Sequence, residues 1–271
     1  MTTPDSPDAP LTYGRYLKVA DLLSLQRCRS DGPDGPEHDE MLFIVIHQVY
    51  ELWFKQQLWE GDRLCRELAA GRRSEAMPVL GRMLTILKTM VAQIDVLETM
   101  TPVSFQSFRA RLESASGFQS AQFREFEFLL GAKRRRSVEH YAEGTDERNR
   151  LEARFVAPTI WDAFLRYLVE TGVDVPAEAL DRDVRTPIEP CEALQPVLID
   201  LYRNEPDARS VAERLVDLDE GVQEWRYRHV KMVERTIGFK RGTGGSSGAG
   251  YLRDTLFRPA FPDLWAIRTE L

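Results

Sequence analysis

The histidines are the side chains best suited to chemistry near neutral pH, because an imidazole ring can bind a metal or exchange a proton there. The 271 residues contain only four of them: His38, His47, His140 and His229. His38 and His140 lie in polar stretches, which predicts that both are exposed. His47 and His229 lie in apolar stretches with helical spacing, so they are the two candidates for a site.

His47 lies in a segment that is apolar on nearly every side. A helix would place Phe43, Tyr50 and Phe54 on the face of His47, because residues three and four apart are neighbours on a helix. The pattern predicts an aromatic lining that contains one imidazole ring. A hydrogen-bonded histidine in the core is the simpler interpretation of a single such residue.

His229 also falls within a stripe of apolar residues at spacings of three and four. The other members of this stripe are Leu218, Val222, Trp225, Met232, Val233 and Thr236. Arg226, Arg228 and Lys231 flank it and could reach an acidic group nearby. A core histidine is again the simpler interpretation, but two such histidines on the two longest expected helices could together flank a flat apolar cofactor.

Haem suits a single neutral imidazole ligand, whereas zinc or non-haem iron requires three or more side chains close together. Neither His47 nor His229 has a second histidine or a carboxylate pair at metal-binding spacing. The three cysteines, Cys28, Cys65 and Cys191, form no CxxC pair and indicate neither zinc, covalent haem nor a disulfide framework. The pattern favours haem but does not identify a reaction.

Two further features could bind an anion. Arg109 follows Phe105 and Phe108 on one expected helix, and its guanidinium could pair with a substrate carboxylate. A surface arginine on an amphipathic helix is the simpler alternative. The glycine-rich stretch 238–248 is either a flexible linker or a cradle of backbone N–H groups. It lacks the lysine of a phosphate-binding loop, so no nucleoside triphosphate is expected.

Helical periodicity dominates the chain and alternating strand patterns are nearly absent, which predicts an all-α fold. Helices are expected over 40–70 (with Asp39 as N-cap), 74–100, 103–112, 120–131, 147–156, 159–170 and 207–237, and from about Tyr251. Clusters of glycine, proline and serine predict loops over 31–36, 114–118, 171–190 and 238–250. We expect a disordered tail over residues 1–10 and one helical-bundle domain over 11–271.

The net charge of −7 argues against a nucleic-acid-binding protein. The basic run 133–136 is explained more simply as a solvated helix end. The N-terminus lacks the basic and apolar regions of a signal peptide, and the longest apolar run, 41–46, is too short to cross a membrane. We therefore expect a cytoplasmic protein without membrane or nucleic-acid partners.

Several segments together resemble the tryptophan 2,3-dioxygenase family. They are LTYGRYL at 11–17, HDEMLFIVIHQ at 38–48, ELWFK at 51–55, LETMTP at 97–102, FR at 108–109, SASGFQS at 114–120, RHVKMVERTIG at 228–238 and KRGTGGSSG at 240–248. These blocks follow the order of the family and spread from about residue 11 to 257. No single histidine or glycine motif among them would carry the resemblance alone.

The resemblance implies an all-α homotetramer that holds non-covalent haem b and uses O2. His229 matches the proximal iron ligand, and His47 the distal histidine that hydrogen-bonds the indole N–H of L-tryptophan. Arg109 matches the residue that pairs with the substrate carboxylate. Thr243 matches the residue that contacts the substrate ammonium and carboxylate, and Phe43 matches a pocket wall.

The resemblance also assigns residues around the cofactor and the mouth of the pocket. Ser116 and Gly117 match the turn that lies against haem, Arg124 a position near a propionate, and Gly242 a position in the cofactor-binding loop. Tyr13, Tyr16 and Leu17 match an N-terminal segment that reaches over a neighbouring subunit's pocket. Phe105 and Phe123 stand where some members have tyrosine, so we assign Phe105 no polar role.

The implied reaction adds dioxygen across the C2=C3 bond of the indole and opens the ring to N-formylkynurenine, a step of tryptophan catabolism in the kynurenine pathway. His47 favours this family over the indoleamine dioxygenases, which resemble it in fold but lack the distal histidine. One alternative is a related haem monooxygenase that forms a 2-oxindole from tryptophan or β-methyltryptophan. A helical haem carrier or sensor is another.

Overall fold

The computed structural model describes residues 10–30, 32–33, 35–238, 240, 253 and 256–271. Every regular element within these residues is a helix, so the predicted all-α class is confirmed. The α-helices are α1 Tyr13–Tyr16, α2 Val19–Leu23, α3 His38–Ala69, α4 Arg73–Leu97, α5 Pro102–Arg109, α6 Ala121–Leu129, α7 Arg135–Glu139, α8 Asp146–Val156, α9 Ile160–Glu170, α10 Ala177–Leu180, α11 Gln195–Asn204, α12 Pro206–Ile237 and α14 Pro262–Ala266. Three short 3-10 helices are η1 Ala110–Leu112, η2 Gly117–Gln119 and η3 Ile267–Thr269.

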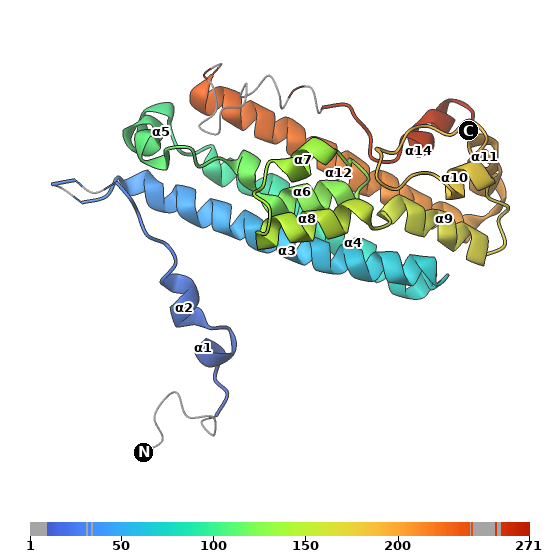
Figure 1. The fold of residues 1–271 in the computed structure, drawn as a ribbon, viewed down its shortest axis with the longest axis horizontal. Helices are drawn as coiled ribbons and strands as arrows, with labels where there is room; N and C mark the ends of the chain where they lie inside the picture. The colour runs from blue at the N-terminus through green and yellow to red at the C-terminus, as the bar shows by residue number, and fades with distance from the viewer. Residues whose placement is uncertain (1–9, 31, 34, 239, 241–252, 254–255) are drawn as a thin grey trace.

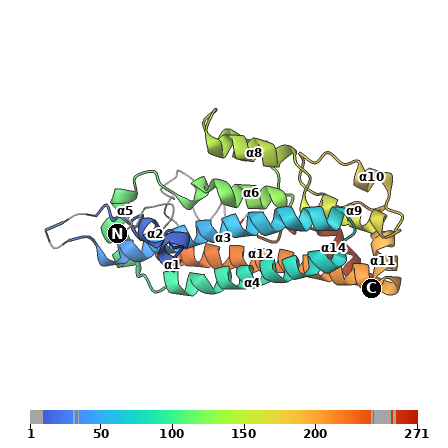
Figure 2. The same cartoon turned by 90° about the horizontal axis from the view of Figure 1, so that it is seen from below.

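Three long helices form the frame of the molecule. Helices α3, α4 and α12 run side by side (Figures 1 and 2), and α4 packs against both of the others. Helices α6 and α9 pack against α3, and α8 covers α6. Leu64, Met83 and Leu215, one from each long helix, have no exposed surface. The apolar stripes predicted from helical spacing thus meet in one large core.

The ends of the long helices differ in part from the sequence-based prediction. The N-cap of α3 is Glu37 rather than Asp39, which lies inside the first turn. There Asp39 faces the positive end of the helix dipole without being its cap. Helix α4 ends at Leu97, and Thr101 then caps α5 by accepting a hydrogen bond from the backbone N–H of Ser104 at 3.1 Å. Helix α12 ends at Ile237, and its C-cap Gly238 has a positive φ of 61°, which suits glycine.

The basic run 133–136, expected to be a solvated helix end, is one only in part: Arg135 and Arg136 are exposed at the start of α7, whereas Lys133 is buried. Lys133 is only 1% exposed. Its Nζ donates to the backbone oxygens of Phe155, at 3.0 Å, and of Ala157. These carbonyls lie at the end of α8, where helical partners are missing, so the lysine satisfies them. Burial lowers the pKa of Lys133 to about 8.

The N-terminal helices α1 and α2 stand away from the long helices in Figure 1. Tyr13 and Tyr16 are 79% and 71% exposed, and Leu17 is also exposed. The segment after α2 returns to the bundle at Glu40, whose carboxylate accepts backbone N–H groups of Arg29 and Ser30, both at 2.8 Å. Glu40 therefore fixes the point from which this exposed arm leaves the bundle.

Some sequence-based expectations lie outside the described residues. Of the tail expected over 1–10, only Pro10 is described, and of the glycine-rich loop over 238–250 only Gly238 and Lys240. The helix expected from about Tyr251 is described only at Arg253 before residue 256. The region 171–190, expected to be a plain connection, contains the short helix α10. No helix within the described residues combines the length and the apolar character needed to cross a lipid bilayer.

The C-terminal segment is attached to α12 by one buried carboxylate. The side chain of Asp219 accepts the backbone N–H of Ala260 at 2.8 Å and that of Phe261 at 3.1 Å. It also accepts the indole N–H of Trp265 at 2.9 Å. Asp219 is 1% exposed, so water could not take its place as the acceptor for these donors.

We expect Asp219→Ala to lower the free energy of unfolding by about 3 kcal/mol, because it leaves these three donors, and the side-chain amide of Gln223 that donates to Asp219 at 3.0 Å, without their acceptor. Chemical denaturation followed by circular dichroism measures this change. Asp217→Ala is the matched control, since Asp217 lies on the same helix and pairs with the exposed Arg214. The control should change stability by less than about 0.5 kcal/mol. Equal losses in both variants would contradict this role of Asp219.

Candidate active site

A cavity of about 260 Å³ lies between α3, α5, α6 and α12, and the end of α4 also lines it. Its lining is mainly aromatic and aliphatic, and the two histidines singled out from the sequence both belong to it. Phe43, Tyr50 and Phe54 line the cavity together with His47, as the helical spacing predicted. His38 and His140 are exposed, also as predicted. The sequence pattern therefore separated the two cavity histidines from the two surface histidines correctly.

The ring of His47 has a defined orientation and tautomer. Its Nδ1 lies 2.7 Å from the carbonyl oxygen of Phe43, one helical turn earlier. A carbonyl oxygen can only accept, so Nδ1 carries the proton and Nε2 carries a lone pair in the neutral ring. The ring of Phe43 packs on the imidazole at 4.1 Å between centroids. Within the described residues, Nε2 has no hydrogen-bond partner.

The charge state of His47 follows from its surroundings. Burial lowers the pKa of His47, although the hydrogen bond to Phe43 and the carboxylate of Glu51 act in the opposite direction. The neutral form therefore prevails at pH 7. A neutral imidazole with a free lone pair can accept a hydrogen bond from an N–H group that enters the cavity.

His229 approaches the same cavity from α12. Its ring stacks on the indole of Trp225 with centroids 5.3 Å apart and planes within 6°. Burial, together with the smaller effect of the nearby His47, lowers the pKa of His229 to about 4. Among the described side chains and backbone groups, neither ring nitrogen of His229 has a hydrogen-bond partner. A neutral, unpartnered imidazole in an apolar cavity is suited to bind a metal.

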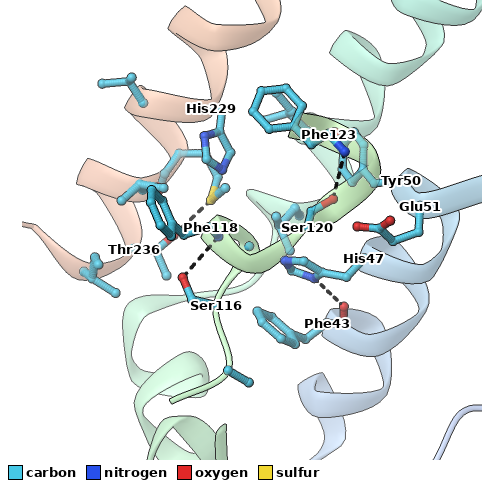
Figure 3. A pocket seen from close by; sticks show the side chains of 18 of the residues that line it. Phe43, His47, Tyr50, Glu51, Ser116, Phe118, Ser120, Phe123, His229 and Thr236 are labelled. Atoms are coloured by element: carbon cyan, nitrogen blue, oxygen red, sulfur yellow. Dashed lines mark hydrogen bonds between the residues drawn. The ribbon is translucent and has the colours of Figure 1, made fainter. Parts of the chain in front are cut away.

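His47 and His229 point into one space from opposite helices, as Figure 3 shows. The turn that includes Ser116 and Phe118 passes beside them. Within the part of the chain that the structure describes, no three His, Cys, Asp or Glu side chains are placed to hold a metal ion. The site can thus offer one neutral imidazole to a metal that brings its other ligands, as the iron of haem does.

The turn between α5 and α6 has a stable local structure. The hydroxyl of Ser116 accepts the backbone N–H of Phe118 at 3.3 Å, and the side chain of Gln119 accepts the N–H of Ser116 at 3.3 Å. This reciprocal pair is a capping box at the start of η2. Ser116 and Gly117 line the cavity, which agrees with their prediction as site residues without testing their role.

Arg109 ends α5 and lines the cavity, where the simpler sequence interpretation expected a surface arginine. Arg109 is half-buried, and Phe105, four residues earlier, also lines the cavity. A cation at the boundary between an apolar cavity and water can pair with an anionic group of a bound molecule.

One charged group of the site was not predicted from the sequence. Glu127 lines the cavity and is 2% exposed. It accepts hydrogen bonds from Arg124 at 2.6 Å and from Arg226 at 3.1 Å. Arg226 and Glu127 are 99 positions apart in the chain, and nothing in the sequence indicates that they meet. The flanking arginines of His229 did suggest an acidic partner, and Glu127 is one of the partners found.

Some predicted site residues are not assembled by the described chain. Thr243 and Gly242 lie outside the described residues. Tyr13, Tyr16 and Leu17 lie on the exposed arm, and none of them lines the cavity of its own chain. Arg124, predicted to lie near the cofactor, does line the cavity.

A family model described as tryptophan 2,3-dioxygenase matches residues 3–159 and 190–271. All the residues discussed for the site fall within these two ranges. The unmatched residues 160–189 include α9, which packs against α3, and α10, which packs against α9. None of these residues lines the cavity.

Curated relatives with the same name cover nearly the whole chain. The tryptophan 2,3-dioxygenase of Herpetosiphon aurantiacus is 58% identical over 96% of this chain and 98% of the relative. That of Anaeromyxobacter sp. (strain K) is 56% identical over the full length of both. That of Bordetella pertussis is 40% identical over 96% of this chain and 91% of the relative.

The lowered pKa of His47 predicts how the stability of the protein without cofactor depends on pH. Below about pH 6.5 the histidine in the unfolded chain gains a proton that the folded protein does not. The contribution of His47 to stability is therefore complete above pH 6.5 and is lost as the pH falls toward its lowered folded value. We expect the free energy of unfolding of the wild type to fall, relative to that of His47→Leu, between pH 7 and pH 5.

Denaturant titrations of both proteins at pH 7, 6 and 5 measure this difference. The comparison with His47→Leu removes the contributions of carboxylates, which also titrate in this range. A difference that stays constant with pH would show that the folded state does not disfavour the charged form of His47.

Proposed function

Because the chain belongs to the tryptophan 2,3-dioxygenase family, we propose that it is an oxidoreductase that cleaves the indole C2–C3 bond of L-tryptophan with O2. The product is N-formylkynurenine, in which both oxygen atoms of O2 are incorporated. Haem b is the proposed cofactor. The observation that carries the proposal is the pair of neutral imidazoles, His47 and His229, that face one apolar cavity from opposite helices.

The residues present fit haem. His229 is neutral and has no hydrogen-bond partner in the described part of the chain, so its ring would be available to bind the haem iron. The flat ring of Trp225 packs against it, and the aromatic lining suits a planar apolar group. We assign Ser116, Gly117 and Arg124 to contacts with the cofactor, and Gly242 as well. When bound, haem supplies the redox-active iron at which O2 reacts with the indole.

His47 orients the indole ring. Since Nδ1 donates to the Phe43 carbonyl, the Nε2 lone pair faces the cavity and accepts the indole N–H. This hydrogen bond fixes the rotation of the ring in the cavity and so determines which indole carbons face the reacting oxygen. Phe43 forms the adjacent wall, and the aromatic lining excludes water that would compete for the imidazole.

Arg109 holds the amino-acid end of the substrate. Its guanidinium can form two parallel hydrogen bonds with the tryptophan carboxylate, which rejects indoles that lack this group. We assign Thr243 to the substrate ammonium and carboxylate. In this arrangement polar groups recognise the amino acid and apolar groups enclose the ring, so one pocket selects both halves of tryptophan.

We propose a homotetramer in which the N-terminal arm completes a neighbour's site. Tyr13, Tyr16 and Leu17 are exposed apolar side chains on an arm that stands away from its own bundle. Such an exposed patch is expected to be covered in the assembled protein. The hydrogen bond from the backbone N–H of Ser30 to the Glu40 carboxylate fixes the arm where it joins the bundle. This contact limits the range of positions that α1 can reach.

The product formed by the reduced, haem-loaded protein tests the proposed function. We expect L-tryptophan and O2 to give a product heavier by two oxygen atoms, with both atoms labelled when 18O2 is used. Mass spectrometry measures the gain, and ultraviolet absorption detects the opened ring. His229→Ala should lose the spectrum of an axial histidine and the activity together.

A product heavier by only one oxygen atom would instead identify an oxindole-forming monooxygenase. Stable haem binding with no turnover of any indole would identify a carrier or sensor. An unchanged axial-histidine spectrum in His229→Ala would contradict the assigned iron ligand.

Arg109→Ala should lower kcat/KM for L-tryptophan by about 10- to 100-fold, because it removes charged hydrogen bonds to the carboxylate. Haem content should remain that of the wild type. Arg109→Lys is the matched variant: it keeps the charge but cannot form the paired hydrogen bonds, so it should recover only part of the loss. Steady-state kinetics provides the measurement, and unchanged kcat/KM in Arg109→Ala would contradict the assignment.

A further inference from the structure

One buried carboxylate beside the cavity binds three guanidinium groups. Glu127 Oε2 accepts from Arg124 Nη1 at 2.6 Å, and Oε1 accepts from Arg226 at 3.1 Å and from Arg134 at 3.3 Å. The arginines come from α6, from α12 and from the residue before α7. The cluster therefore joins three parts of the chain at one point.

Three of the four side chains in the cluster are largely removed from water, and the fourth, Arg134, is 32% exposed. The side chains of Glu127 and Arg124 are 3% and 6% exposed, and that of Arg226 is 12% exposed. Burial alone would raise the pKa of Glu127, but the three guanidinium groups outweigh it and hold this pKa below its usual value. Glu127 is thus ionised, and the four side chains together carry a formal charge of +2.

Three members of the cluster, Arg124, Glu127 and Arg226, also line the cavity. Arg124 is further positioned by packing, since its guanidinium lies 4.7 Å from the ring centroid of Phe118. A carboxylate that holds two arginines on the wall of an apolar cavity prepares them to meet an anion without rearrangement. If the only role of this cluster were to join the helices, its side chains would not need to face the cavity.

We infer that Glu127 is a positioning residue, which holds Arg124 and Arg226 at the cavity wall so that both guanidinium groups receive carboxylates of the porphyrin. This inference rests on the proposed function, because it requires haem in the cavity. It assigns a role to Arg226 and Glu127, which the sequence did not single out for cofactor binding. Haem b carries two carboxylates, and the cluster offers two cavity-lining guanidinium groups.

The test compares iron protoporphyrin IX with its dimethyl ester, in which both carboxylates are blocked, on the wild type and on Glu127→Gln. The dissociation rate is measured by transfer of the porphyrin to an excess of a haem-scavenging protein. Glu125→Gln is the matched control, because Glu125 is a buried carboxylate on the same helix that pairs with Arg150 and does not line the cavity. Circular dichroism verifies that each variant folds.

We expect Glu127→Gln to release haem about 10- to 100-fold faster than the wild type, as is usual when a group that orients a ligand contact is removed. The ester should leave the wild type faster by a similar factor. Glu127→Gln should then have little further effect on the ester, because the blocked carboxylates no longer use the arginines. Glu125→Gln should release haem and ester at wild-type rates.

An equal acceleration for haem and ester in Glu127→Gln would show a purely structural role and overturn the inference. If Glu127→Gln does not fold, Arg226→Gln replaces it, since it leaves the pair of Glu127 and Arg124 intact. The same selective loss of haem over ester is then expected, and an equal loss overturns the inference.

If the wild type oxidises tryptophan but binds haem no more tightly than its ester, the inference is overturned and the proposed function is not. A wild type that binds neither porphyrin overturns the proposed function with it.

Discussion

The site depends on keeping two imidazole rings uncharged between two long helices. A charged ring is costly in an apolar cavity, and the depressed pKa values of His47 and His229 reflect that cost. Each uncharged ring has a nitrogen lone pair that can accept a hydrogen bond or bind a metal. The helices α3 and α12 can present both rings to one space because α4 packs against each of them and sets their separation. The long helices thus serve as a rigid support for two nitrogen atoms.

Charged groups stabilise the frame at places where the apolar core ends. Asp219 attaches the C-terminal segment to α12, and Lys133 satisfies the last carbonyls of α8. Glu127 joins α6 to α12 at the wall of the cavity. In each case a buried ionic group has several partners, which offsets the loss of its hydration. The cavity can therefore be apolar inside while its position is fixed by ionic contacts around it.

Local patterns were sufficient to predict the two cavity histidines and their aromatic neighbours, whereas the other site residues came from the resemblance to the family. The spacing of Phe43, His47, Tyr50 and Phe54 places them on one helical face whatever surrounds the helix, and the structure confirms that they share the cavity. Contacts between segments far apart in the chain produce no comparable pattern in the sequence. A charged residue such as Lys133 or Arg226 is usually solvated, so periodicity alone did not indicate its burial or its partner. Helix α10 was missed because four residues are too few to establish a periodicity. The ten-residue helix α11 was not predicted either.

The acceptor that determines the tautomer of His47 is a main-chain atom, the carbonyl of Phe43. Every amino acid supplies this oxygen, so no side-chain replacement at position 43 can delete it while the helix remains. The wall of the pocket and the protonation of its histidine are therefore under separate control, although one residue contributes to both. Natural or designed variants could reshape this wall for ring-substituted indoles and still inherit the same hydrogen-bond acceptor.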